Sequence, residues 1–144
     1  MRVSGPWDLS RAEAFLTDAL IPLRLAVLDG GGTPILVSLW FLYEDGTLWC
    51  ATQRNARTAR QLEADPRCAF EIAPDEPPYC GIRGQAVAVV RADAGERILA
   101  RLLDRYGQRD TDLERWLLSR AADEVALQLK PKALHTWDFS NRMR

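Results

Sequence analysis

The sequence predicts a mixed α+β domain in which six or seven mainly antiparallel strands form a small barrel with helices outside it. Asp45-Gly46 separates two apolar runs, and this dipeptide is typical of a tight β-hairpin. Two glycines interrupt the apolar stretch 80–91, where they favour the bend or close backbone approach that a closing barrel needs. Ser10 and Thr111 each begin a Ser/Thr-x-x-Glu pattern, which predicts the start of a helix.

Hydrophobic spacing and turn residues divide the first half of the chain. Ser10 is the expected N-cap of the first helix, with Glu13 reaching back to it. The run from Ile35 to Tyr43 is apolar on both faces, which favours a barrel strand that packs inward and against a partner subunit. The expected elements are a helix from Arg11 to Leu20, strands from Leu23 to Asp29, Ile35 to Tyr43 and Leu48 to Thr52, a helix over 55–64, and a strand from about Cys68.

Hydrophobic spacing and turn residues also divide the second half of the chain into helices and strands. Asp93 is the expected N-cap of a helix that Gly107 ends, because glycine favours the left-handed conformation found after helices. Gly81 and Gly84 lie inside the strand that precedes it. The expected elements are a strand from Cys80 to Arg91, a helix from Ala94 to Tyr106, a helix opened by Thr111, and strands from Glu124 to Leu129 and from Ala133 to Phe139.

Composition fits one globular domain over residues 1–144, with 47% hydrophobic and 27% charged residues. The net charge of −1 argues against a general nucleic-acid or membrane surface. There is no apolar run of about 18 residues, and the first residues lack the apolar core of a signal peptide. We therefore expect a cytoplasmic protein that binds neither nucleic acid nor membrane.

The cysteines and the single histidine do not form a metal-binding pattern. Cys50, Cys68 and Cys80 are far apart in sequence, and His135 is the only histidine. A zinc site needs about four close ligands, so no metal is expected. All three cysteines fall in expected apolar strands, which indicates buried and unreactive thiols.

The segment after Thr52 carries the clearest candidate chemistry. Arg54, Arg57 and Arg60 follow one another at intervals of three, and the last two share one face of the expected helix. The free N–H groups of a helix start favour a negative ligand, so this turn is a candidate phosphate site. The alternative is a solvated basic face balanced by the acidic residues that follow it.

Several segments occur in a recognisable order along the chain: the Glu44-Asp45-Gly46 turn between two strands, Thr52 and the arginine-rich turn, Asp65-Pro66-Arg67, Tyr79–Ala86 and Leu134–Phe139. Together they resemble the pyridoxamine 5′-phosphate oxidase-like flavoproteins, the FMN-binding split β-barrels. The resemblance runs from about Leu23 to Phe139 and implies the split-barrel fold, FMN as cofactor, a small-molecule substrate, and a homodimer with the cofactor site at its interface.

The resemblance also implies roles for particular residues. Arg57 and Arg60 would hold the cofactor phosphate, assisted by the Thr52 and Thr58 hydroxyls. Many members carry lysine where this chain has Thr58, and some carry arginine where it has Ile35, so Arg54 or Arg60 would have to compensate.

Other residues are implied to contact the flavin ring. The strand Val37, Ser38, Leu39 and Trp40 would lie along the isoalloxazine, although a plain core role for Trp40 is equally open. Trp137 of a partner chain would cover the ring.

These features predict an FMN-dependent oxidoreductase whose substrate is unknown. Because the flavin carries the redox chemistry, no set of catalytic side chains is expected, and none is identified. A deazaflavin-dependent reductase of the same fold is one alternative, and a flavin- or haem-binding protein without turnover is another. The chain lacks the basic C-terminal segment of true pyridoxamine-phosphate oxidases after Phe139, so vitamin B6 oxidation is not expected.

Overall fold

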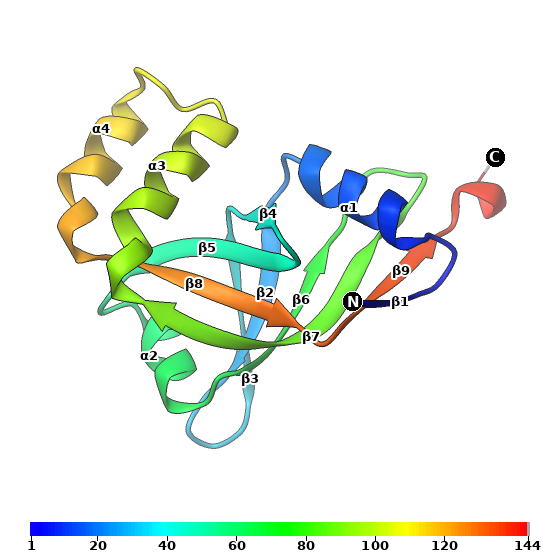
Figure 1. The fold of residues 1–144 in the computed structure, drawn as a ribbon, viewed down its shortest axis with the longest axis horizontal. Coiled ribbons are helices and arrows are strands. Elements are labelled where there is room, and N and C mark those ends of the chain that lie inside the picture. The colour runs from blue at the N-terminus through cyan, green and yellow to red at the C-terminus, as the bar shows by residue number, and fades with distance from the viewer. Residues whose placement is uncertain (144) are drawn as a thin grey trace.

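The computed structural model describes residues 1–143, which form a curled sheet with helices packed around it (Figure 1). No helix within these residues is long and apolar enough to cross a membrane. The strands are β1 (Arg2–Ser4), β2 (Leu23–Leu28), β3 (Pro34–Leu39), β4 (Leu42–Glu44), β5 (Thr47–Gln53), β6 (Arg67–Ile72), β7 (Cys80–Arg91), β8 (Glu124–Pro131) and β9 (Ala133–Asp138). The α-helices are α1 (Leu9–Asp18), α2 (Arg57–Ala64), α3 (Gly95–Arg105) and α4 (Asp112–Ser119), with short 3-10 turns η1 (Ala92–Ala94), η2 (Ala121–Asp123) and η3 (Ser140–Arg142).

The sheet has the topology of a split barrel. Seven strands follow one another by antiparallel pairing in the order β3-β2-β6-β7-β8-β5-β4, so β3 and β4 end the path without pairing to each other. β9 pairs with β7 off this path, and β1 pairs parallel to β9. The predicted α+β fold, a split β-barrel of six or seven strands with flanking helices, is confirmed. The terminal strand β1 was not predicted.

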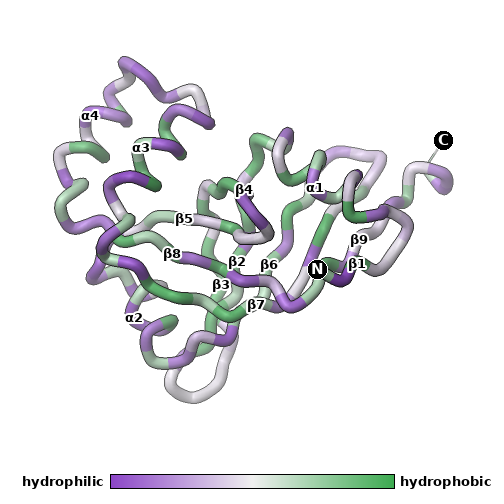
Figure 2. Tube along the Cα trace, viewed as in Figure 1, coloured by the Kyte–Doolittle hydropathy of each residue, from purple (hydrophilic) through white to green (hydrophobic). Residues whose placement is uncertain are grey.

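Strand alternation places one apolar core inside the curl. In β2, Leu23, Leu25 and Val27 are buried while Arg24 faces solvent, as expected for a strand with one face on the core. A second apolar cluster lies outside the curl, where Ile98 and Leu102 of α3 pack over Ala126 of β8. Figure 2 shows apolar segments along both the strands and α3. Helix α3 therefore covers the outer face of β5 and β8, whereas α2 packs against β7 and β2.

The predicted strand from Ile35 to Tyr43 is wrong in its middle. β3 ends at Leu39 and β4 begins at Leu42, so Trp40 and Phe41 form a break between them. A side chain from a distant helix occupies this break. The Tyr106 hydroxyl accepts a hydrogen bond from the backbone N–H of Phe41 at 3.3 Å. The ring of Trp40 stacks on the ring of Tyr106, with the ring centroids 5.0 Å apart. Tertiary packing here replaces the ladder hydrogen bonds of a continuous strand.

Two predicted helix caps are also wrong. Asp8, not Ser10, is the N-cap of α1, because its Oδ1 accepts the N–H of Arg11 at 2.9 Å. Asp93 does not cap α3. Its carboxylate instead accepts two hydrogen bonds from the guanidinium of Arg91, at 2.9 and 2.8 Å. At the first helix the actual cap lies two residues before the expected one. At the second, an arginine two residues before Asp93 binds the carboxylate that was expected to cap the helix.

Two other predicted helix signals, at Thr111 and Gly107, are confirmed. The Thr111 hydroxyl accepts the N–H of Glu114 at 3.0 Å and caps α4. The Glu114 carboxylate reaches the N–H of Asp110 at 3.1 Å rather than that of Thr111, so the capping box is half formed. Gly107 follows α3 with φ +69°, the left-handed conformation that glycine adopts easily.

The two glycines inside β7 allow close backbone approach. A Cβ on Gly81 would lie 2.7 Å from the carbonyl oxygen of Ile72, and one on Gly84 would lie 2.6 Å from that of Ala133. Both contacts are to backbone, which has little room to move. Of the two predicted reasons for these glycines, close approach is the one that the structure supports.

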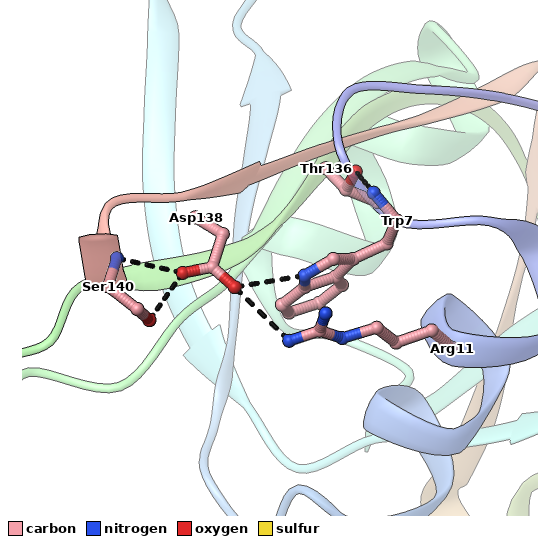
Figure 3. Close-up of polar contacts among 5 residues, drawn as sticks. All are labelled: Trp7, Arg11, Thr136, Asp138 and Ser140. Atoms are coloured by element: carbon pink, nitrogen blue, oxygen red, sulfur yellow. Dashed lines mark hydrogen bonds and ion pairs between the residues drawn. The ribbon is translucent and has the colours of Figure 1, made fainter.

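The N-terminal segment is held to β9 by a polar cluster around Asp138 (Figure 3). The carboxylate of Asp138 accepts three hydrogen bonds: from the indole N–H of Trp7 at 3.1 Å, from the guanidinium of Arg11 at 3.2 Å and from the backbone N–H of Ser140 at 2.9 Å. The hydroxyl of Thr136 accepts the backbone N–H of Trp7 at 3.1 Å. These bonds fix the start of α1 against the last strand.

Candidate functional site

A cavity of about 240 Å³ lies where the split of the barrel meets the helical pair α3–α4. Most of its lining is apolar, and its only charged lining residue among those described is Glu124. Two other hollows, on the outer face of β2, β6 and β7, contain none of the predicted cofactor residues. The lining residues are Pro22, Ser38, Leu39, Trp40, Ala51, Leu99, Leu102, Leu117 and Glu124.

Three of the four predicted ring-contact residues line this cavity. Ser38, Leu39 and Trp40 form its β3 side, and the Ser38 hydroxyl accepts a hydrogen bond from Arg24 at 2.7 Å. Val37 is half-buried and packs against the main core. The structure therefore brings the β3 edge and the Trp40 break together at one opening, while Val37 supports them from inside.

The basic turn begins at the end of β5. Arg54, Arg57 and Arg60 are all exposed, and within residues 1–143 their side chains have neither an ion pair nor a hydrogen bond. No side chain caps the start of α2, whose N-cap residue is Ala56. Asp65 pairs with Arg67 at 2.7 Å and so does not balance the turn. Free guanidinium groups suit both a solvated face and an anion grip.

The opposite side of α2 explains its orientation. Ala59 and Leu62 are buried in the main core, so the face carrying Arg57 and Arg60 points outward. Thr52 and Thr58 are half-buried near this turn.

Gln53 connects the basic turn to the cavity. Its side-chain amide donates to the carboxyl of Glu124 and to the carbonyl oxygen of Arg120, the latter at 3.2 Å. The N–H of Arg54 donates to the carbonyl oxygen of Asp123 at 2.8 Å. The end of β5 is thus fixed to the start of β8, and Arg54 follows the cavity-lining residue Ala51 by three positions.

Glu124 was not predicted as a functional residue. It is only 5% exposed, and burial raises the pKa of its carboxyl, while the hydrogen bond from Gln53 and the charge of Arg120 act in the opposite direction. The only sequence signal was an acidic residue opening the apolar strand Glu124–Leu129. Its burial depends on packing that the sequence does not reveal locally.

Trp137 is not brought to this cavity within one chain. It lies on β9 opposite Gly81, half-buried, and its ring packs against Phe139 with centroids 5.6 Å apart. Its indole N–H is buried without an acceptor among the described residues. Its predicted role from a partner chain stays a prediction.

The single histidine does not line the cavity. His135 is exposed on β9, and its Nδ1 lies 2.8 Å from the hydroxyl of Ser4. Residues 1–143 contain no group of three or more His, Cys, Asp or Glu side chains placed to hold a metal ion.

The residues present fit a flavin mononucleotide in kind. An apolar cavity with an aromatic wall suits a planar ring, and free arginines beside a helix start suit a phosphate. The volume of about 240 Å³ is below the roughly 300–1,000 Å³ of most small-molecule pockets, so it holds only part of such a ligand.

Comparison with known proteins defines the class. The family model described as pyridoxamine 5′-phosphate oxidase matches residues 11–138, and the chain therefore belongs to this family. None of the curated proteins matches the chain.

Several solved structures share the fold. A conserved hypothetical protein from Mycobacterium tuberculosis is 21% identical, with a TM-score of 0.80 over 93% of this chain and 86% of that one. An F420 reductase is 21% identical, with a TM-score of 0.73 over 90% of this chain and 98% of that one. The haem storage protein HutZ from Vibrio cholerae is 22% identical, with a TM-score of 0.68 over 93% and 94% of the two chains. At these identities the similarity concerns the fold.

Proposed function

We propose that the chain is an FMN-dependent oxidoreductase acting on a small molecule. The observation that carries this proposal is that Arg57 and Arg60, which have no partner among the described residues, lie on the helix that follows and contacts β5, and that Ala51 of β5 lines a cavity walled by Ser38 and Trp40. Membership of the pyridoxamine 5′-phosphate oxidase family supports it. A bound flavin supplies the redox chemistry, and the protein supplies binding and orientation.

The phosphate contacts follow from charge and geometry. The guanidinium groups of Arg57 and Arg60 bind the phosphate from one face of α2, and the Thr52 and Thr58 hydroxyls assist. The uncapped N–H groups at the start of α2 add donors that favour the same anion. Arg54 supplies a further positive charge at this turn.

The ring contacts come from the edge of β3. The segment 37–40 orients the flavin ring, with Trp40 as the aromatic wall. Because one chain offers a cavity of only about 240 Å³, a second chain completes the site, and Trp137 of that chain covers the ring. This arrangement makes the functional unit a homodimer, which we place in the cytoplasm.

A deazaflavin cofactor is the second candidate. The similarity to an F420 reductase, which extends over 98% of that chain, favours it, and Thr58 stands where many flavin-binding members have lysine. The same phosphate grip serves either cofactor. Haem is less favoured, because the single histidine, His135, lies beside Ser4 on β9, away from the cavity lining.

Substitution of Arg57 tests the phosphate grip. Arg57→Ala removes one charge-assisted contact, worth about 1.5–3 kcal/mol, so FMN should bind about tenfold or more weakly. Fluorescence titration with FMN and with a deazaflavin measures both affinities. Arg109→Ala, which removes an exposed arginine paired with Asp104, is the matched control. Equal FMN affinity in wild type and Arg57→Ala would refute the grip, and exclusive binding of deazaflavin would favour the second candidate.

A further inference from the structure

Glu124 places a buried carboxyl in the wall of the cavity between β3 and β5. The residue is 5% exposed, and its Oε2 accepts a hydrogen bond from the side-chain amide of Gln53. Its other oxygen, Oε1, accepts no hydrogen bond within residues 1–143, and it is not one of the fully buried side-chain atoms without a partner, so it keeps some accessible surface. This oxygen belongs to a residue that lines the cavity, so a bound molecule can donate a hydrogen bond to it.

The position of this carboxyl is fixed by the backbone around it. A Cβ on Gly95 would lie only 1.9 Å from the carbonyl oxygen of Glu124, so the start of α3 presses directly on the start of β8. Gln53 pairs with Glu124 across the β5–β8 ladder. A binding group held in this way keeps its geometry when a ligand enters.

Burial raises the pKa of the Glu124 carboxyl, and two neighbours offset only part of this rise. Gln53 donates to it, and Arg120 contributes a positive charge, and both lower the pKa that burial raises. The other cavity residues from β5, α3 and α4 are Ala51, Leu99, Leu102 and Leu117, none of them charged. The carboxyl is therefore the one acidic acceptor among the described lining residues of an otherwise apolar space.

We propose that Glu124 is the polar recognition residue of this cavity, and that its Oε1 accepts a hydrogen bond from an N–H group on a planar ring bound against Trp40. The proposal rests on the proposed function, since a flavin is a planar ring whose pyrimidine edge carries an N–H group. It adds a specificity residue that is not among the predicted contacts on β3 and α2.

This assignment has an electrostatic consequence for a redox-active ring. Two-electron reduction of a flavin adds two electrons with one or two protons, so the ring gains negative charge when only one proton is taken up. A fixed carboxylate close to the ring opposes this gain. Glu124 therefore makes the protein bind oxidised FMN in preference to reduced FMN and lowers the reduction potential of the bound cofactor.

Potentiometry on the full chain with FMN tests this role. Glu124→Gln keeps the shape of the side chain and its bond to Gln53 but removes the charge. The midpoint potential of bound FMN should become more positive by about 30 mV or more. For a two-electron couple this shift corresponds to a tenfold change in the ratio of the affinities for oxidised and reduced FMN. Glu124→Asp retains the charge and should stay nearer to wild type. Glu71→Gln, which removes an exposed carboxyl from β6, is the control.

A second variant tests the location independently. Ala51→Leu adds bulk to the cavity wall without touching the carboxyl, so it should weaken FMN binding at least tenfold while thermal unfolding shows a folded protein. If Ala51→Leu binds FMN normally, or if Glu124→Gln leaves the potential unchanged, the role of Glu124 is wrong while the flavin function stands. If wild type binds no FMN, the proposed function and this inference both fail.

Discussion

Asp138 allows a sharp test of how the two ends of the chain stabilise the fold. Its carboxylate accepts hydrogen bonds from Trp7, Arg11 and Ser140, and it joins the entry of α1 to the end of β9 (Figure 3). Asp138→Asn keeps the size of the side chain but exchanges one oxygen for an N–H donor. We expect the free energy of unfolding to fall by about 2–4 kcal/mol.

The contacts contribute unequally to this loss. The side chain of Arg11 is 62% exposed, so its ion pair is screened by solvent and adds at most about 1 kcal/mol. Trp7 is only 5% exposed. In the variant its indole N–H either faces the N–H of the new side-chain amide at position 138 or loses its hydrogen-bond acceptor. A buried donor without an acceptor costs about 1–3 kcal/mol, so the bond to Trp7 dominates. Arg11→Met should therefore cost much less than Asp138→Asn.

The pH dependence gives a second measure. The hydrogen bonds from Ser140, first from its hydroxyl and then from its N–H, lower the pKa of Asp138 below its usual value of 3.8. A carboxyl with a depressed pKa contributes stability above its unfolded-state pKa and loses it as the pH falls through its folded-state pKa. The gap between wild type and Asp138→Asn should therefore be full at pH 7 and shrink below about pH 4.

Urea unfolding followed by tryptophan fluorescence measures this gap at each pH. Asp75→Asn, in the exposed loop before β7, removes a carboxylate that has no hydrogen bond among the described residues and should leave stability unchanged. Equal stability of Asp138→Asn and wild type at pH 7 would refute the reasoning. So would a gap that stays constant into acid, because the charge of Asp138 would then be irrelevant.

Three further substitutions or treatments probe the packing. Gly95→Ala places a Cβ 1.9 Å from the carbonyl oxygen of Glu124, and we expect a loss of about 3 kcal/mol in urea unfolding, whereas Gly31→Ala in an open turn should be tolerated. Arg105→Met removes three donors to the carbonyl oxygens that end α1 and should cost about 2–4 kcal/mol in the same assay. Burial raises the pKa of Cys68 to about 11, so at pH 8 it should react with a disulfide reagent at least about 100 times more slowly folded than unfolded; rapid reaction would contradict its burial.

Several parts of the fold followed from local sequence signals, although the caps predicted at Ser10 and Asp93 did not. The Asp45-Gly46 turn, the Thr111 cap and the glycine after α3 each act within a few residues, and each appears in the structure as predicted. The break at Trp40 and Phe41 did not follow, because both residues favour a strand. What interrupts the strand is Tyr106, which lies 65 residues away from Phe41 in sequence.

The residues of the candidate site also differ in whether the sequence could predict them. The grouping of Arg57 and Arg60 was predictable because three-residue spacing on a helix is a local property. Glu124 was not, because its burial and its bond to Gln53 arise between residues 71 positions apart. An acidic residue at a strand start ordinarily faces solvent, and only the approach of α3 and β5 encloses this one.

Two side-chain atoms in residues 1–143 are buried without a hydrogen-bond partner, and they have different meanings. Arg105 Nε belongs to a guanidinium whose other nitrogens donate three hydrogen bonds, so most of its donor capacity is used. Trp137 Nε1 is the only polar atom of its side chain, and leaving it unpaired costs about 1–3 kcal/mol. Natural folds seldom keep such a cost without a reason. An acceptor from a second chain or from the cofactor removes it, which is the arrangement that the proposed dimeric site requires.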